Sequence, residues 1–149
     1  ISSNTVSILV ENARIRGAID ACIGAMGFIH GPIDLEMIRS IDEKRQSANQ
    51  CFSHAGISKI AGINTKVTQT KDEIIKKAQQ NDENAKLAIA HYTYKIAGYI
   101  ANMATAMNGA DVIVFTAGVG ENNIAIRREI CEKLSPLGIK IDLDKKINL

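Results

Sequence analysis

Hydrophobic and polar positions alternate along the first part of the chain in a way that is typical of strands. Residues 5–10 are rich in β-branched side chains, and residues 15–20 resume the alternation after the polar residues 11–14. Because side chains alternate between the two faces of a strand, these runs predict a β-hairpin. Residues 24–32 contain three glycines, and we interpret them as a loop whose backbone turns sharply or approaches another group closely.

Helical spacing first occurs in residues 35–49. The apolar positions recur at three-residue steps among charged side chains and predict an amphipathic helix; they are Leu35, Ile38 and Ile41. Residues 55–63 are interrupted by glycine and are expected to include one short buried strand.

Two further helices are predicted in the middle of the chain. Thr70 and Glu73 have the spacing of a capping box, which predicts a short helix over residues 71–80. Residues 84–107 place apolar side chains at steps of three and four and predict the longest helix. Gly98 lies inside it, where glycine costs about 1 kcal/mol relative to alanine, so it either marks a close contact or is simply tolerated.

The last part of the chain predicts a strand, a glycine turn and a helix. Residues 110–116 form a near-continuous apolar run, the pattern of a central strand covered on both faces. The turn at 117–123 leads into a helix whose apolar residues share one face: Ile126, Ile130 and Leu134. Pro136 and Gly138 end that helix, and residues 138–142 predict a short strand.

Composition and charge narrow the class of protein. With 46% hydrophobic and 23% charged residues, the chain has the composition of one globular domain. Its formal net charge of +2 lacks the basic excess that binding to nucleic acid exploits. No apolar run approaches the about 20 residues of a spanning helix, so we expect a soluble, cytoplasmic protein without membrane contacts. The chain opens with Ile1 and leads straight into a strand, so we expect a piece of a longer protein.

The three cysteines are widely spaced and include no Cys-x-x-Cys pair. Cys22, Cys51 and Cys131 therefore predict neither a disulfide framework nor a zinc site, and we interpret them as reduced and buried. No metal site is expected from the sequence.

A strand that feeds a glycine turn at the start of a helix can hold a nucleotide, because free backbone amides point outward and missing side chains admit close contact. Gly118 and Gly120 provide this pattern. The pattern alone is weak evidence and fits a plain tight turn better, since it is neither a Walker loop nor a full dinucleotide fingerprint.

The string Gly-Ala-Asp-Val-Ile-Val-Phe-Thr-Ala-Gly-Val-Gly-Glu-Asn, at residues 109–122, resembles the adenosine-binding segment of acetate kinases and their butyrate and propionate kinase relatives. The similarity extends from residues 85–88 to residues 137–139. It implies an α/β fold: the ribonuclease-H-like second lobe of an actin-like ATPase, with helices packed on a mixed sheet of about five strands. Residues 1–149 would be the C-terminal, nucleotide-binding lobe, with the N-terminal lobe absent.

The resemblance also implies an activity, namely ATP-dependent phosphoryl transfer with Mg²⁺ to a small carboxylate. It implies that nucleotide contacts come from Gly118, Val119, Gly120, Glu121 and Asn122. Polar residues at the start of the chain would cradle a phosphate, or else form a frayed terminus: Ser3, Asn4 and Thr5. Related kinases dimerise through this lobe, so the intact protein is expected to be a homodimer. This lobe alone is expected to be inactive.

Two departures from the family pattern stand out. The family segment Gly-Thr-Arg-Ser-Gly-Asp-Ile-Asp corresponds to residues 27–34, where Ile29 replaces the arginine that contacts the acyl phosphate. The family's Asp-x-Arg at the adenosine pocket falls near residues 69–71, where only Lys71 has a counterpart. The first half is more similar to kinase-related methanogenesis marker proteins of methanogenic archaea.

Several single residues have two interpretations. His30 is a general acid or base or a phosphate contact, or else an ordinary surface histidine. Asp34 orients a metal-bound phosphate or caps the helix that follows it. Arg127 and Arg128 lie early in the last helix, where the helix dipole disfavours cations, and either mark a nearby phosphate or belong to the solvated surface.

Three functional hypotheses follow. The first is the carboxylate kinase. The second is a non-catalytic, ATP-responsive actin-like binding or assembly protein of methanogenic archaea, which the missing arginine favours. The third is a structural domain whose glycine turn binds nothing.

Overall fold

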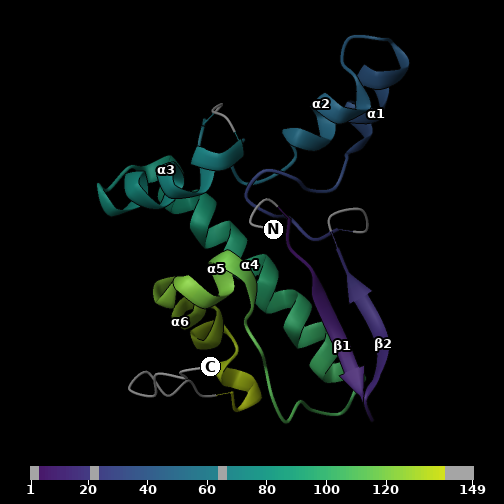
Figure 1. Cartoon of the computed structure of the whole chain (residues 1–149), viewed down its shortest axis with the longest axis vertical. Coiled ribbons are helices and arrows are strands. Elements are labelled where there is room, and N and C mark those ends of the chain that lie inside the picture. The colour runs from purple at the N-terminus through teal and green to yellow at the C-terminus, as the bar shows by residue number, and fades with distance from the viewer. Residues whose placement is uncertain (1–3, 21–23, 64–66, 140–149) are drawn as a thin grey trace.

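The long helix α4 (Glu83–Ala106) crosses the molecule diagonally, and the other elements are arranged around it (Figure 1). A β-hairpin lies on one side of α4. The helices α3 (Val67–Gln79) and α6 (Ile124–Lys133) also pack against α4. This computed structural model describes residues 4–20, 24–63 and 67–139.

The hairpin consists of the antiparallel strands β1 (Ser7–Glu11) and β2 (Arg14–Ile19). Asn12 and Ala13 connect them with φ angles of 51° and 58°. Two consecutive residues with positive φ are typical of the two-residue turns that match the twist of paired strands. The predicted hairpin is therefore confirmed.

The hydrophobic core forms where α3, α4 and α6 meet the glycine-rich loop. The rings of Phe28 and Tyr92 pack with their centroids 5.0 Å apart, which joins that loop to α4. The predicted face of α6 is confirmed, because its apolar residues are 1–3% exposed: Ile126, Ile130 and Leu134. Burial of such side chains is the main favourable contribution to folding.

The helix predicted over residues 35–49 is in fact two helices. The first, α1 (Leu35–Asp42), ends before Lys44, whose φ of 58° is incompatible with a continuing helix; the second is α2 (Ala48–Ser53). Leu35 and Ile38 are 62% and 53% exposed, so the apolar stripe of α1 faces outward in this chain. Figure 1 shows the two helices together at one end of the molecule.

The predicted short strand and capping box are both wrong. Residues 55–63 form consecutive turns and no strand. The helix α3 begins at Val67, so Thr70, which is 2% exposed, lies inside the helix and does not cap it. Glu73 instead forms an ion pair with Lys77, one turn further along α3, with 3.6 Å between Oε1 and Nζ.

The prediction of α4 as the longest helix is confirmed for the described residues. Asp82 caps it by accepting a hydrogen bond from Ala85 N at 2.8 Å. A Cβ atom on Gly98 would have no other atom within 4 Å. Gly98 is therefore tolerated in the helix and does not mark a close contact.

The central strand predicted at residues 110–116 is absent. This segment has no regular secondary structure, and the sheet among the described residues has two strands, β1 and β2. Ile113 and Phe115 pack against the core, whereas Val112 and Val114 are 75% and 77% exposed. The run therefore has the composition of a doubly covered strand, but only one of its faces is covered here.

The last described elements are α5 (Ala117–Asn122), α6 and the 3-10 helix η1 (Ser135–Leu137), which ends at Gly138 with a φ of 77°. Most of the strand predicted at 138–142 lies outside the described residues. Cys51 and Cys131 are free and buried, as predicted, and Cys22 lies outside the described part. None of the described helices is long and apolar enough to cross a membrane.

Candidate functional site

His30 lies on a loop whose backbone is fixed by the segment that follows α2. Three hydrogen bonds of 2.7–3.0 Å make this connection: Gly56 N donates to Ile29 O, Ile57 N to Gly27 O and Ser58 N to Phe28 O. A Cβ atom on Gly56 would lie 2.4 Å from the carbonyl carbon of Ile29, so only glycine fits there. The close backbone approach that the glycines predict is therefore present, and it holds His30 in place.

The imidazole of His30 contacts two side chains from other parts of the chain. Its Nδ1 atom lies 2.5 Å from Oδ1 of Asn4. The ring of Phe52, from α2, stacks on it with centroids 4.5 Å apart and planes 8° from parallel. Burial by these neighbours lowers the pKa of His30 below its usual 6.5, because desolvation disfavours the charged ring. The structure thus brings together two predicted site residues, Asn4 and His30.

Ile29, at the position of the family's arginine, is part of the hydrophobic core and only 6% exposed. The Ile29 side chain is therefore covered by its neighbours in this chain. The loop presents the neighbouring His30 instead, so the acidic or basic chemistry available here is that of an imidazole.

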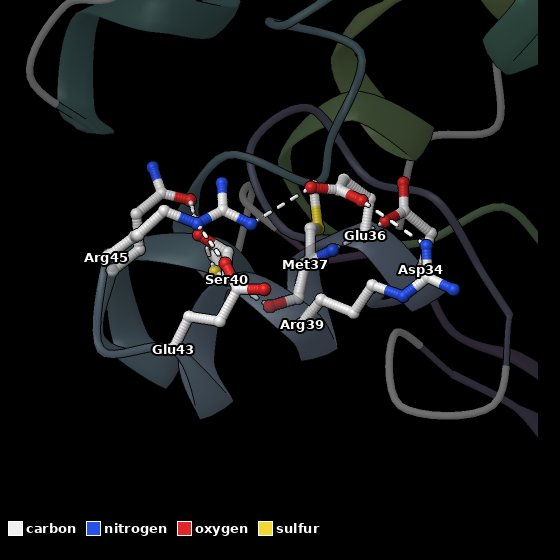
Figure 2. Close-up of polar contacts among 9 residues, drawn as sticks. Asp34, Glu36, Met37, Arg39, Ser40, Glu43 and Arg45 are labelled. Carbon is white, nitrogen blue, oxygen red and sulfur yellow. Dashed lines mark hydrogen bonds and ion pairs between the residues drawn. The ribbon is translucent and has the colours of Figure 1, made fainter.

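Asp34 caps helix α1. Its Oδ1 atom accepts a hydrogen bond from Met37 N at 2.8 Å, and its backbone is extended (Figure 2). This is the geometry of an N-cap, in which the carboxylate satisfies one of the free amides of the first turn. The second interpretation of Asp34, as a ligand for a metal-bound phosphate, stays a prediction.

A network of charged side chains surrounds that cap. Arg45 donates to Glu36 Oε1 at 3.1 Å and to Glu43 Oε2 at 2.6 Å, and Arg39 pairs with Glu36 at 3.8 Å (Figure 2). The hydrogen bond to Glu36, followed by that to Glu43, raises the pKa of Arg45. A hollow of about 500 Å³ adjoins the network, and its lining also includes His54 and Lys59. Because Arg45 is already bonded to two carboxylates, it offers little charge to an anionic ligand.

The predicted glycine turn is the short helix α5. Glu121 Oε1 accepts hydrogen bonds from Ala117 N at 2.8 Å and from Thr116 Oγ1 at 3.3 Å, so it closes the start of the helix. Asn122 Nδ2 donates to Gly118 O at 3.1 Å. Ala117 has a φ of 61°, a left-handed conformation that costs an alanine about 1–3 kcal/mol and is concentrated at functional sites. Within the expected bend of free amides, the amide of Ala117 is already bonded to Glu121.

The end of α5 is held by the helix that follows. Arg127 Nη1 donates to the carbonyl oxygens of Gly120 at 2.8 Å and Glu121 at 2.6 Å. The cation therefore satisfies the free carbonyls at the end of α5, which explains its unfavourable place early in α6 without a phosphate. Asn123 both ends α5 and caps α6, accepting from Ile126 N at 3.0 Å.

The remaining predicted site residues have contacts of other kinds. Thr5 Oγ1 donates to the hydroxyl oxygen of Tyr92 at 3.2 Å, which connects the chain start to α4. Lys71 pairs with its neighbour Asp72 at 3.6 Å. Val119 packs against the core. Ser3 lies outside the described residues.

Sequence reasoning missed Phe52 and the role of Arg127. Phe52 lies 22 positions after His30 in the sequence, and no periodic pattern relates the two. The role of Arg127 could have been found from its positive charge near a helix N-terminus, because a cation placed there needs a hydrogen-bond acceptor nearby.

Solved structures similar to this chain include two small-molecule kinases. The propionate kinase of Francisella tularensis subsp. tularensis SCHU S4 superposes on 93% of this chain with a TM-score of 0.75 and 26% identity, and the chain covers 37% of it. The acetate kinase of Porphyromonas gingivalis superposes on 95% with a TM-score of 0.73 and 25% identity, and the chain covers 36% of it. The chain therefore has the α/β fold of part of these kinases.

The sequence pattern of the Acetokinase family matches residues 22–149, and the chain belongs to this family. Its curated relatives include UPF0285 proteins of methanogenic archaea. The one from Methanothermobacter thermautotrophicus is 50% identical over 120 residues, and the one from Methanococcus vannielii 44% over 120 residues; each match covers 80% of this chain. The chain spans 36% of the length of these two relatives.

Proposed function

We propose that residues 1–149 are the C-terminal, nucleotide-binding lobe of an acetate- or butyrate-kinase-like phosphotransferase that acts on a carboxylate. The observation that carries this proposal is the agreement of the family match with the superposition on two kinases over more than nine-tenths of the chain. In phosphoryl transfer a protein acts mainly by positioning groups and offsetting charge, so a single lobe would be inactive alone.

The proposed nucleotide site is α5, with Gly118, Val119, Gly120, Glu121 and Asn122. Two features support it: the hydrogen bonds from Arg127 fix the helix, and its two glycines leave backbone without side chains for a purine nucleoside to approach. Asn4 and Thr5, with Ser3 before them, would contact the phosphates, and Lys71 would provide a further basic group. Mg²⁺ would be held largely by the phosphates of ATP and by water.

The lobe would contain the mixed ribonuclease-H-like sheet that the family resemblance implies. Support comes from the unpaired segment at residues 110–116, whose exposed valines Val112 and Val114 have no covering layer here. On β1 and just before it, Ile8, Val10 and Val6 are also 54–55% exposed. In the intact protein, strands and helices outside this chain would cover these side chains. The intact protein would be cytoplasmic and homodimeric, with nucleotide and a small carboxylate as its ligands.

The test uses the full-length protein with Mg·ATP and a panel of short carboxylates. ADP release that depends on one acid supports the kinase, and calorimetric binding of ADP that Gly118→Val weakens at least about tenfold supports the nucleotide site. Gly98→Ala, at an open helical position, is the matched control for folding. Nucleotide binding that is unchanged by Gly118→Val and Asn122→Ala together would contradict the proposed site.

A second candidate function is a non-catalytic, ATP-responsive binding or assembly protein. The burial of Ile29 favours it, because the position of the family's arginine carries no cation. The same panel separates the two functions: saturable ADP binding without turnover on any acid would indicate the binding protein. Absence of any saturable nucleotide signal would contradict both and leave a structural domain.

A further inference from the structure

Two adjacent residues of α4, Tyr92 and Thr93, each form a hydrogen bond with a segment that is distant in the sequence. The hydroxyl oxygen of the buried Tyr92 accepts a hydrogen bond from Thr5 Oγ1 at 3.2 Å, across 87 positions. The hydroxyl of Thr93, which is also buried, donates to Glu129 Oε1 of α6 at 2.7 Å, across 36 positions. A single turn of α4 is therefore bonded both to the chain start and to α6.

The hydrogen bond between Thr93 and Glu129 defines where α6 lies along α4. The other buried side chains of α6 are Ile126, Ile130 and Cys131, and their burial stabilises the contact without a preferred direction. A hydrogen bond has a preferred distance and angle, and a carboxylate acceptor makes it stronger than a bond between neutral groups. Thr93 Oγ1 also lies 3.0 Å from a carbonyl oxygen of its own helix, so Glu129 is the partner that joins the two helices.

The position of α6 in turn determines the position of α5. Arg127, two residues before Glu129, donates to Gly120 O at 2.8 Å and to Glu121 O at 2.6 Å. Both carbonyl groups belong to the proposed nucleotide site. A shift of α6 along α4 would therefore displace the backbone proposed to contact the nucleoside, and a misplacement of about 1 Å is enough to impair a functional site strongly.

Tyr92 acts on the other proposed part of the site, the chain start. Its hydroxyl oxygen accepts from Thr5, which is proposed to contact the phosphates. The ring of Tyr92 is itself held by Phe28 of the glycine-rich loop, with centroids 5.0 Å apart. Burial raises the pKa of Tyr92, so the phenol stays neutral at neutral pH and adds no negative charge beside the phosphates.

We propose that Tyr92 and Thr93 are positioning residues for the two ends of one nucleotide. Tyr92 acts through Thr5 on the phosphates, and Thr93 acts through Glu129 and α6 on the nucleoside at α5. This inference rests on the proposed nucleotide site. Because the two side chains occupy adjacent positions of one helix, α4 sets the spacing between the segment for the phosphates and the segment for the nucleoside.

The experiment compares ADP with adenosine, which has no phosphates, in the full-length protein. Calorimetry measures ADP binding directly and adenosine binding by competition with ADP. Tyr92→Phe keeps the ring and removes the acceptor oxygen; it should lower the affinity for ADP about threefold to tenfold and leave the affinity for adenosine unchanged. Thr93→Val keeps the branched shape and removes the hydroxyl; it should lower both affinities by the same factor, about threefold to tenfold.

Matched controls for these two variants come from the same helix. Tyr94→Phe changes a tyrosine that is 64% exposed, and Thr105→Val changes an exposed threonine whose hydroxyl donates within α4. Both should leave the affinities for ADP and adenosine unchanged. Thr93→Ser keeps the hydroxyl and should keep both affinities within about twofold of the wild type.

Variants on α6 test the same connection from the other side and do not alter the buried residue of α4. Glu129→Ala should reproduce the effect of Thr93→Val on both ligands, and it serves in its place if Thr93→Val does not fold. Lys133→Ala removes the other partner of the same carboxylate oxygen, a partly exposed ion pair of 3.2 Å, and should change neither affinity.

Two results would overturn the inference alone, provided that Gly118→Val weakens ADP binding. One is an unchanged affinity for ADP in either Tyr92→Phe or Thr93→Val. The other is a loss in Tyr92→Phe that is equal for ADP and adenosine, as a general disturbance of the fold would produce. Absence of ADP binding to the wild type, or ADP binding with which adenosine does not compete, would overturn the proposed nucleotide site, and this inference with it.

Discussion

Nδ1 of His30 lies 2.5 Å from Oδ1 of Asn4, although the two residues are 26 positions apart. The contact connects the start of the chain to the glycine-rich loop, across the entire hairpin. A polar terminal segment and a histidine between glycines each have ordinary explanations when considered alone. Their contact gives both residues a defined position beside each other.

The protonation of His30 should make stability depend on pH. Burial lowers the pKa of His30 in the folded state below the 6.5 of an unfolded chain, so the unfolded state binds more protons in this range. The free energy of unfolding should therefore decrease as the pH falls through about 6.5 toward the folded-state pKa. Urea unfolding of the wild type and of His30→Gln between about pH 8 and about pH 5 measures this contribution. Equal pH dependence in both proteins would contradict it; His54→Gln is the control.

Gly56 should not tolerate a side chain. A Cβ atom there would lie 2.4–2.6 Å from backbone atoms of Ile29, so Gly56→Ala should lower the free energy of unfolding by about 1–3 kcal/mol or more. Gly98→Ala has open space inside a helix and should stabilise the protein by about 0.5–1 kcal/mol. Chemical denaturation measures both variants, and a change of the same sign in the two would refute this account of the loop.

Variants of Asp34 can separate its role as the cap of α1 from a role in binding a metal-bound phosphate. Asp34→Ala removes the cap of α1 and should cost about 1 kcal/mol, whereas Asp34→Asn caps equally well and should leave stability unchanged. Thermal unfolding measures the difference. If Asp34→Ala leaves stability unchanged, the cap is unimportant; if Asp34→Asn alone weakens binding of Mg·ATP, the carboxylate acts on the metal-bound phosphate as well.

Arg127 should stabilise helix α5 locally. Arg127→Ala removes two hydrogen bonds to the end of α5 and should cost about 1–2 kcal/mol, with faster amide exchange in residues 117–122. The neighbouring Arg128 is exposed, and Arg128→Ala should change stability by no more than about 0.5 kcal/mol. Hydrogen exchange read by mass spectrometry distinguishes the two, and equal exchange in both variants would argue against the role of Arg127.

The exposed valines test whether the sheet is larger in the intact protein. Val112→Asp with Val114→Asp should cost about 2–4 kcal/mol in the full-length protein, because charges would be buried there. The same pair should cost little in the 149-residue chain, where these side chains are exposed. A small cost in both lengths would mean that no further layer covers residues 110–116.

The sequence predicts local elements well where periodicity and turn chemistry agree. The hairpin, α4 and the buried face of α6 follow directly from the spacing of apolar residues. The helix at 35–49 is predicted too long, because the stripe of Leu35, Ile38 and Ile41 continues to suit a helix until Lys44 takes a positive φ. The capping box at Thr70 is wrong because the helix starts earlier, which the spacing of two polar residues cannot show.

The sequence does not show which distant segments pair with one another. The apolar run at 110–116 carries the composition of a central strand, but strand formation needs a hydrogen-bonding partner, and the described chain provides none. In the candidate site, His30 and Asn4 could be chosen one at a time from their residue types. Their contact, and the stacking of Phe52, depend on how distant loops fold together.

Asn123 is the C-cap residue of α5 and the N-cap residue of α6, so the two helices meet at a single residue. Rotation at this joint would break the cap on Ile126 N and stretch both bonds from Arg127. Helix α5 can therefore change its orientation only if α6 moves with it. Because α6 packs on α4, a ligand that binds at α5 would meet a surface that is already ordered. A displacement of α5 would then require α4 and α6 to move together with it.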